Sequence, residues 1–289
     1  MKVLVTGSEG FIGNYLCRQL QNPIRFDKKL GSDLTDFSHV KKTFADFEPE
    51  VAVHLAGNAY VGYARENPDK DCYANVIGTI NLLRASAMAK SKVIFASSAQ
   101  VYGVNNAKAL TEEYPTKPMH PYAISKASAE HYCKWFSENF GLSVSVLRFS
   151  NVFGFGRRSD VFADFFNMAK EKGAIRIRGN AYNAPDFVHV NDVVRAILSV
   201  MAAPLNGFQV FNVCSGQSVT ILEIAGEIAK FFDANVEYDS NNNINDAYVF
   251  RLSNKKLCRE LGWKPETSLE EALQEMFMKM NAREDRITT

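Results

Sequence analysis

Short runs of apolar, often β-branched residues alternate with longer amphipathic stretches through the first half of the chain. The runs predict five strands, at Lys2 to Thr6, Ile24 to Asp27, Val51 to Leu55, Lys92 to Ser97 and Ser143 to Arg148. The stretches between them predict helices over 11–21, 37–47, 69–89 and 122–139. Because the strands are nearly continuously apolar and are separated by helices, they indicate a parallel sheet buried on both faces. The predicted fold class is therefore α/β, with a doubly wound parallel sheet.

The alternation of strands and helices loosens after about residue 154. We predict a sheet-forming domain over 1–154, with a returning segment near 186–215, and a smaller α/β region over most of 155–289 that packs on the C-terminal edge of the sheet. A polar loop is expected at 240–246 and a frayed tail at 284–289. The remaining elements are helices over 160–172, 191–202, 220–232, 254–261 and 268–281, and strands near 175–178 and 208–213.

The amino-acid composition limits the classes of protein to which the chain can belong. The 289 residues are 46% hydrophobic and 22% charged, as in globular proteins, and 33 basic residues against 32 acidic ones give a net charge of +1. This balance gives no electrostatic reason to bind nucleic acid or an anionic membrane, and no apolar run reaches the roughly 18 residues of a membrane span. The five cysteines are widely separated and form no C-x-x-C pair, so we expect free thiols, no metal site and a cytoplasmic protein.

A glycine-rich loop, Thr6-Gly7-Ser8-Glu9-Gly10-Phe11-Ile12-Gly13, joins the first predicted strand to the first predicted helix. Glycines allow the backbone to turn sharply, to approach a pyrophosphate and to pack helix against strand, while N–H groups at the helix N-terminus bind phosphate. The spacing is G-x-x-G-x-x-G rather than the commoner G-x-G-x-x-G. Because strand, loop and helix come in the required order, the sequence predicts a Rossmann-type dinucleotide site in residues 1–154.

The second predicted strand ends at Asp27, 14 residues beyond Gly13. A carboxylate there can accept hydrogen bonds from the adenosine ribose, which favours NAD over NADP because it repels a 2′-phosphate. Lys28 and Lys29 follow directly and favour the opposite choice. NAD is therefore predicted as the cofactor, and NADP is left open. The next candidates are Asp33 and Leu34, which are placed to contact the adenine ring.

Three further residues form a candidate acid/base group. Tyr122 and Lys126 are four residues apart, so on a helix they share one face, and the lysine ammonium is expected to lower the pKa of the phenol. Ser98 follows the fourth strand, and strand ends of a doubly wound sheet face the ligand crevice. We therefore predict that Ser98, Tyr122 and Lys126 are catalytic.

With these segments in place, the sequence resembles the extended short-chain dehydrogenase/reductases, the NAD-dependent nucleotide-sugar epimerase/dehydratase family. The resemblance covers nearly the whole chain. The matching segments are TGSEGFIG (6–13), VHLAG (53–57), NVIGTINLL (75–83), SSAQVYG (97–103), PYAISK (121–126), LRFSNVFG (147–154), DFVHVNDV (186–193), FNVCSGQ (211–217) and LGWKP (261–265).

This resemblance implies a nucleotide-sugar substrate that is bound mostly by 155–289, and hydride transfer between C4 of its hexose and NAD or NADP. Tyr122 would move the hydroxyl proton with help from Lys126 and Ser98, and Lys126 would also hold the nicotinamide ribose. His54 and His189 lie in structural runs of the family, which favours core or loop-pinning roles over catalysis. The implied cofactor-binding residues are Gly7, Gly10, Phe11, Ile12, Gly13, Asp27, Asp33, Leu34, Leu55, Ala56, Gly57, Asn75, Ser97, Tyr122 and Lys126. The implied substrate-binding residues are Ser98, Asn151, Arg157 and Arg178.

Several reactions share this chemistry. HLAGNAYV, NVIGTINLL and NVCSGQ look most like the GDP-4-keto-6-deoxymannose reductases, which favours reduction of an NDP-4-keto-6-deoxyhexose. The alternative within the family is a UDP-glucose-like NDP-hexose 4-epimerase. A non-catalytic NAD(P)-sensing protein is an alternative of another class, although such a protein needs no activated tyrosine. The 4,6-dehydratases of the family carry an acidic pair where this chain has Ala99 and Gln100, which argues against that reaction.

Two arginines that grip the nucleotide diphosphate in many family members are missing. The position of the first arginine is occupied by Pro185, and the position of the second lies in the loop SNNNINDAY, 240–248. Arg157 and Arg158, or Arg176 and Arg178, are candidates to replace them, and each is equally compatible with a solvated surface charge.

The helices over 75–89 and 122–139 carry apolar residues on more than one face, which predicts that each packs against more than the sheet. In the family, these two helices build a four-helix bundle across a two-fold axis, so the resemblance implies a homodimer. The alternative is that the C-terminal region covers them. The residues concerned are Ile77, Ile80, Leu83, Ile124, Tyr132, Trp135 and Phe136.

Overall fold

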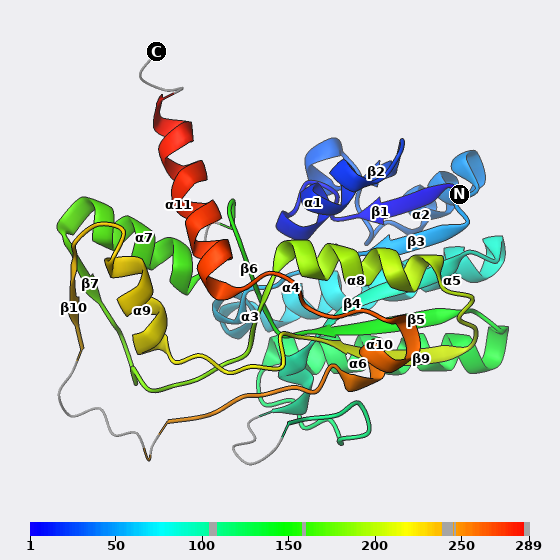
Figure 1. Cartoon of the computed structure of the whole chain (residues 1–289). Helices are drawn as coiled ribbons and strands as arrows, with labels where there is room; N and C mark the ends of the chain where they lie inside the picture. The colour runs from blue at the N-terminus through cyan, green and yellow to red at the C-terminus, as the bar shows by residue number, and fades with distance from the viewer. Residues whose placement is uncertain (104–108, 158–159, 239–244, 246, 286–289) are drawn as a thin grey trace.

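A six-stranded parallel sheet forms the centre of the chain in the computed structural model, which describes residues 1–103, 109–157, 160–238, 245 and 247–285 (Figure 1). Its strand order is β2-β1-β3-β4-β5-β9, and each neighbouring pair is parallel. The predicted doubly wound α/β fold is therefore confirmed. The strands are β1 (Val3–Thr6), β2 (Ile24–Phe26), β3 (Val51–His54), β4 (Lys92–Ser98), β5 (Val144–Phe149) and β9 (Phe208–Val213).

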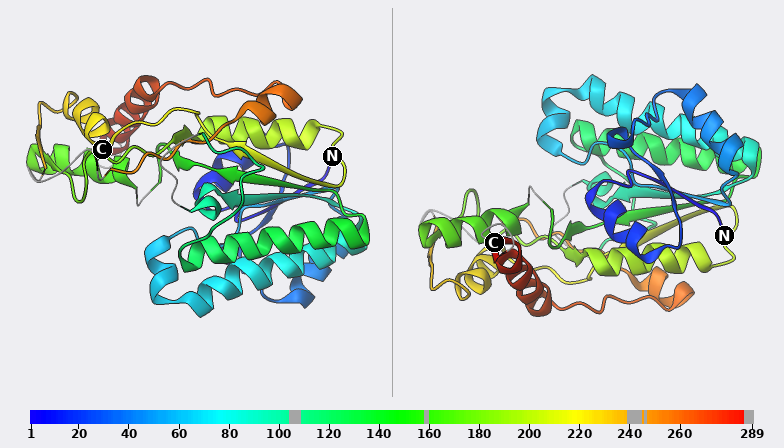
Figure 2. Two further views of the ribbon diagram at one scale, coloured as in Figure 1. Left: turned by 90° about the horizontal axis from the view of Figure 1, so that it is seen from below. Right: turned by 90° about the horizontal axis from the view of Figure 1, so that it is seen from above.

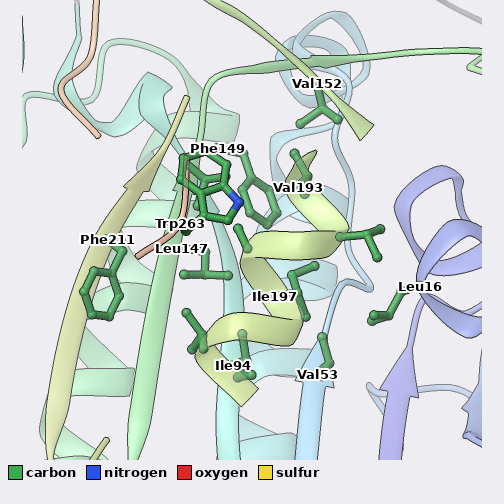
Figure 3. Packing of buried hydrophobic residues seen from close by; sticks show 14 of the residues in the cluster. Leu16, Val53, Ile94, Leu147, Phe149, Val152, Val193, Ile197, Phe211 and Trp263 are labelled. Carbon is green, nitrogen blue, oxygen red and sulfur yellow. The ribbon is translucent and has the colours of Figure 1, made fainter. Parts of the chain in front are cut away.

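Helices cover both faces of this sheet, which explains why its strands are apolar at consecutive positions (Figure 2). Along β1, Val3 and Val5 belong to one core cluster, whereas Leu4 between them belongs to the other. Figure 3 shows the first cluster, in which Trp263 and side chains of α8 pack on the sheet. One face is covered by α1 (Phe11–Gln19) and α8 (Val190–Ala202), the other by α2 (Phe37–Phe47), α5 (Gly78–Ala89) and α6 (Pro121–Phe140).

The strand order places a topological switch beside β1. The chain passes from β1 to β2 on one side and then returns to β3 on the other. Ligands of open α/β sheets bind at the carboxyl ends of the strands at such a point. In this chain that position lies at the glycine loop after β1 and the turn after β3.

A smaller group of elements lies beyond the carboxyl edge of the sheet, with a core of its own (Figure 1). It contains two parallel strand pairs, β6 with β8 and β7 with β10. The strands are β6 (Asn151–Phe153), β7 (Ala174–Arg176), β8 (Phe187–His189) and β10 (Asn235–Glu237). Besides α8, the described residues of the second half form the helices α7 (Val161–Lys172), α9 (Ile221–Ala229), α10 (Lys255–Leu261) and α11 (Leu269–Asp285).

The structure corrects the predicted helix over 69–89. The segment is helical, but it consists of α4 (Pro68–Cys72), a π-helical turn η2 (Tyr73–Ile77) and α5, and it is preceded by α3 (Val61–Glu66), which the sequence did not predict. The N–H of Gly78 bonds to the carbonyl of Tyr73, five residues earlier, so one extra residue is accommodated in the helix. Such π-turns occur often at functional sites because they redirect side chains.

Two smaller expectations concern the second half of the chain. Of the tail predicted at 284–289, the first two residues are helical, because α11 continues to Asp285, and the others lie outside the described residues. The polar loop predicted at 240–246 lies almost entirely outside the described residues. Among the helices that are described, none is long and apolar enough to cross a membrane.

Candidate active site

A cavity of about 780 Å³ opens at the switch point of the sheet. Its walls come from the glycine loop, the ends of β2 and β3, and the segment from α3 to η2. It brings together eight of the predicted cofactor-binding residues, namely Gly7, Gly10, Asp27, Asp33, Leu34, Leu55, Ala56 and Gly57. Sequence reasoning missed the wall opposite the glycine loop, where the cavity is lined by Tyr63, Asp69, Lys70, Tyr73 and Ala74.

The glycine loop is held tightly against the start of α1. The N–H of Gly10 donates to the carbonyl of Gly7 at 3.0 Å, and a Cβ added to Gly13 would lie 2.1 Å from the same oxygen. No other residue fits at position 13 without moving the loop. Gly10 caps α1 without a side chain, so the first N–H groups of the helix remain available to an anion. Phe11 and Ile12 are partly buried against the sheet and anchor this turn.

The polar residues after β2 are fixed by short local hydrogen bonds. The carboxylate of Asp27 accepts from the backbone N–H groups of Glu9 at 3.0 Å and Lys29 at 2.9 Å. Asp33 accepts from the N–H and hydroxyl of Thr35. Asn81 of α5 donates to the carbonyl of Leu34 at 2.9 Å. This hydrogen bond holds the segment after β2 against α5. The last contact joins residues 47 apart in sequence, so it could not be predicted from the local pattern of residues.

Ser98, Tyr122 and Lys126 meet at the carboxyl end of β4. Tyr122 lies at the start of α6, and a hydrogen bond links its side chain to that of Ser98. Lys126, one turn later, is 6% exposed and donates from Nζ to the carbonyl of Ala96 at 2.9 Å. The three predicted catalytic residues therefore form one group beside the cavity.

The electrostatics of this group differ from the prediction. Burial raises the pKa of Tyr122, although the hydrogen bond from Ser98 and the charge of Arg157 act in the other direction. The expected lowering of the Tyr122 pKa by Lys126 is therefore wrong for this structure. The physical reason is burial, which disfavours the phenolate of Tyr122 and also lowers the pKa of Lys126 to about 8. Tyr122 is a protonated phenol at neutral pH.

A buried amide network surrounds Asn75 in the π-turn. A Cβ on Gly57 would lie 2.4 Å from Oδ1 of Asn75, so only glycine allows this approach. Nδ2 of Asn75 donates to Ser125 at 3.0 Å and to Asp71 at 3.1 Å. Asp71 is fully buried and also accepts from Asn58 at 2.6 Å. The network joins the turn after β3, the π-turn and α6, and the spacing of Asp71 and Asn75 by one helical turn was the signal that could have revealed it.

Ser97 is directed away from this group. Its hydroxyl donates to Glu130 in the interior, so any contact it makes with a cofactor would come from its backbone. Glu130 forms a buried ion pair with Arg148 of β5, in which Nη2 and Oε2 are 2.6 Å apart. Arg148 also donates to the hydroxyl of Tyr102 at 2.9 Å. This polar cluster therefore ties α6 to β4 and β5 directly behind Ser98.

The predicted substrate residues lie in different places. Asn151, in β6, donates from Nδ2 to the carbonyl of Asp186 at 3.1 Å. Arg157 donates to the carbonyl of Val152 and lies close enough to Tyr122 to affect its pKa. Arg178 follows β7 in the smaller group of elements and is exposed, as is Arg176. Arg158 lies outside the described residues.

The two histidines have structural surroundings. His54 is buried between Thr6 at 2.8 Å and Thr79 at 3.0 Å, and burial lowers its pKa to about 3. The imidazole of His54 therefore remains neutral, and its two hydrogen bonds connect β3 to β1 and to α5. His189 caps α8 by accepting from the N–H of Asn191. Both contacts agree with the core and loop-pinning roles predicted for these residues.

Comparisons with known proteins agree with this geometry. The profile of the NAD dependent epimerase/dehydratase family matches residues 3–214. A putative UDP-glucose 4-epimerase of Methanocaldococcus jannaschii is 32% identical, and the match covers 97% of this chain and 99% of that protein. The UDP-glucose 4-epimerase of Thermus thermophilus in complex with NAD superposes with a TM-score of 0.85 at 27% identity, covering 97% and 99% of the two chains. RMD from Pseudomonas aeruginosa complexed with NADPH superposes with a TM-score of 0.86 at 28% identity, and the match covers 98% of this chain and 100% of that chain.

Proposed function

Since the chain belongs to the NAD dependent epimerase/dehydratase family, we propose that it interconverts a nucleotide-linked hexose and its C4 epimer with NAD as cofactor. The observation that carries the proposal is the meeting of Ser98, Tyr122 and Lys126 at the end of the cofactor cavity. Similarity over nearly the full length to a putative UDP-glucose 4-epimerase supports a UDP-hexose as the first substrate to test. The similarity to the P. aeruginosa protein complexed with NADPH does not distinguish epimerisation from reduction.

The residues of the cavity fit a dinucleotide. The missing Cβ atom at Gly13 lets the glycine loop lie close against the start of α1, and because no side chain caps this helix, its first N–H groups can hold the pyrophosphate. Asp27 is placed at the end of β2, where it can accept hydrogen bonds from the adenosine ribose. Lys126, Asn75 and the turn at Ala56 and Gly57 would hold the nicotinamide end. When it is bound, NAD supplies the hydride acceptor and donor for C4 of the sugar.

Proton transfer is assigned to Tyr122. Because its phenol is protonated at neutral pH, it can donate to a C4 carbonyl oxygen and recover the proton when a C4 hydroxyl is oxidised. The single O–H of Ser98 can donate either to this substrate oxygen or to the oxygen of Tyr122. Arg157 places positive charge near the phenolate that forms, which favours that state.

The neighbouring residues do not support elimination of water. Next to Ser98, the buried Ala99 has no acid/base group, and Gln100 lies 3.5 Å from His120 through its amide oxygen. Neither supplies the carboxylate that a 4,6-dehydration needs. This supports a reaction that ends with the hydride returned to C4.

Reduction of an NDP-4-keto-6-deoxyhexose is the second candidate. It is favoured by the protonated state of Tyr122, which suits donation to a ketone. It needs the same three catalytic residues. The two reactions differ in the fate of the cofactor, which an epimerase regenerates at every turnover and a reductase must exchange.

This difference gives the test of the proposed function. The freshly purified protein is denatured and the released nucleotides are identified by mass spectrometry, while a second sample is incubated with UDP-glucose or UDP-galactose and no added cofactor. We expect NAD(H) in close to stoichiometric amount and interconversion of the two sugars. A protein free of nucleotide that reduces a 4-keto sugar only when NADH or NADPH is added would contradict epimerisation and support the reductase.

We also propose a homodimer formed through α5 and α6. Of the apolar residues expected to form this interface, Leu83 and Phe136 are buried in the core, whereas others on α6 are open to solvent and are not covered by the part of the C-terminal region that the structure describes. The exposed side chains are Ile124 at 50%, Tyr132 at 42%, Trp135 at 49% and Phe140 at 58%. A two-fold axis beside α6 would bring this face against its copy.

The change Trp135→Glu is expected to convert the dimer into single chains, because it places a charge in the centre of an apolar contact. Light scattering after size exclusion measures the mass. Met278→Glu, which alters an equally exposed apolar residue on α11, serves as the matched control and should leave the dimer intact. A wild-type mass of one chain, or a dimer that survives Trp135→Glu, would count against this interface.

A further inference from the structure

Three basic residues lie within two positions of Asp27 in the sequence, at the adenosine end of the cavity. Arg25 lies on β2, and Lys28 and Lys29 follow Asp27 directly. An acidic residue at this end accepts the ribose 2′-hydroxyl of NAD, whereas an arginine nearby accommodates the 2′-phosphate of NADP. Because the chain contains residues of both kinds here, the choice of cofactor depends on what each cation contacts.

Arg25 is held by the glycine loop. Its Nη2 is 2.7 Å from Oε1 of Glu9 and 3.5 Å from the carbonyl oxygen of Ser8. The Glu9 side chain is 23% exposed, so the pair is partly shielded from solvent, and charge-assisted bonds of this kind are the stronger hydrogen bonds of proteins. The guanidinium is therefore committed to an acidic partner within the protein.

The two lysines are also engaged. Nζ of Lys28 is 3.2 Å from Asp33, and Nζ of Lys29 donates to the backbone carbonyl of Glu9 at 3.2 Å. The ion pair between Lys28 and Asp33 is more exposed than the Glu9–Arg25 pair, since 70% of the Lys28 side chain is open to solvent. Asp33 therefore holds Lys28 less firmly than Glu9 holds Arg25. Of the cations beside Asp27, Arg25 is thus the one with the strongest internal partner.

Glu9 stands directly beside the site of the ribose. Its backbone N–H donates to Oδ2 of Asp27 at 3.0 Å, and it precedes Gly10 in the phosphate-binding loop. A 2′-phosphate at Asp27 would meet two carboxylates, Asp27 and Glu9, and a guanidinium already bound to the second one. Like charges there disfavour the phosphate, and the charge of Arg25 is already offset by its ion pair with Glu9.

We propose that Glu9 is a specificity-determining residue, which selects NAD over NADP by holding Arg25 away from the position of the 2′-phosphate. The inference rests on the proposed use of a nicotinamide dinucleotide at this site. It goes beyond that proposal in assigning the choice of cofactor to an ion pair between the glycine loop and β2, rather than to Asp27 alone.

The test measures binding of NADH and NADPH to the full-length protein by fluorescence titration, after any bound nucleotide has been removed. The wild type is expected to bind NADH more tightly. In Glu9→Gln, the freed Arg25 should raise the affinity for NADPH about tenfold, as expected of one charge-assisted hydrogen bond, while the affinity for NADH changes little. In the double variant Glu9→Gln with Arg25→Gln, this gain should disappear.

Two controls make the result specific. Glu227→Gln breaks an exposed ion pair with Lys230 on α9, far from the loop in sequence, and should alter neither affinity. Melting temperatures of all variants show that each is folded before binding is compared. Both glutamate variants remove one negative charge, so the total charge of the protein does not explain a difference between them.

The outcomes separate the inference from the proposed function. Unchanged NADPH affinity in Glu9→Gln would overturn the inference, as would a gain that persists in the double variant, since the gain would then come from lost repulsion and not from Arg25. A wild type that prefers NADPH would overturn it as well, while leaving the proposed reaction intact. A folded wild type that binds neither nucleotide would overturn the proposed function and the inference with it.

Discussion

Turnover is expected to fall by about 10²- to 10⁴-fold when Tyr122 is replaced by phenylalanine, the range in which a positioned general acid/base contributes. The change removes one oxygen atom and keeps the ring, so the packing of α6 should remain. The cofactor cavity is lined by other residues, and binding of NADH should therefore be unchanged. Steady-state kinetics with UDP-glucose or UDP-galactose measure the first effect, and fluorescence titration with NADH measures the second.

Tyr132→Phe is the matched control, because it makes the same chemical change ten residues later on the same helix, where the side chain is 42% exposed. It should leave turnover unchanged. If Tyr122→Phe retained wild-type activity with unchanged NADH affinity, Tyr122 would not be the acid/base. Loss of both activity and NADH binding would instead indicate damage to the site as a whole.

Much of the site could be predicted because its residues are tied to the ends of regular elements. In a parallel sheet, all strand carboxyl ends lie at one edge, so a glycine loop after β1, an acidic residue after β2 and a serine at the end of β4 must come near one another. The one-turn spacing of Tyr122 and Lys126 placed the second half of the group on the facing helix. The structure confirms the sheet and the proximity of these side chains, and their roles stay predictions.

Features that depend on distant partners could not be predicted. The π-turn at 73–77 and the buried Asp71 take their meaning from Asn58 and Ser125, which come from two other segments. The raised pKa of Tyr122 is a consequence of burial, which a sequence pattern does not specify. Arg178, a candidate for the substrate by its charge alone, proved to be exposed beyond β7.

Glu130 and Arg148 illustrate how such a partner pair supports the site. Both side chains are 7% exposed, and Nε of Arg148 is 3.0 Å and 3.2 Å from the two carboxylate oxygens while Nη2 lies nearer still. Glu130 also accepts from Ser97, the residue before Ser98. The pair therefore fixes α6, which carries Tyr122, relative to the strand end that carries Ser98.

Arg148→Met is expected to lower the free energy of unfolding by about 3–5 kcal/mol, because it leaves the carboxylate of Glu130 buried without a counter-charge. Urea denaturation measures the effect as a shift of the midpoint at constant slope. Lys134→Met is the control. It breaks the exposed pair with Glu138 on the same helix, where 54% of the lysine is open, and should cost less than about 1 kcal/mol.

The double variant Arg148→Met with Glu130→Gln distinguishes the effect of an unpaired buried charge from the effect of lost packing around Arg148. Because no unpaired charge then remains, it should recover most of the stability lost in Arg148→Met. A double variant as unstable as the single one would show that packing around Arg148, including its bond to Tyr102, matters more than the charge. A single variant no less stable than Lys134→Met would mean that the pair does not stabilise the fold. The support for Ser98 and Tyr122 would then have to come from the apolar core beneath them.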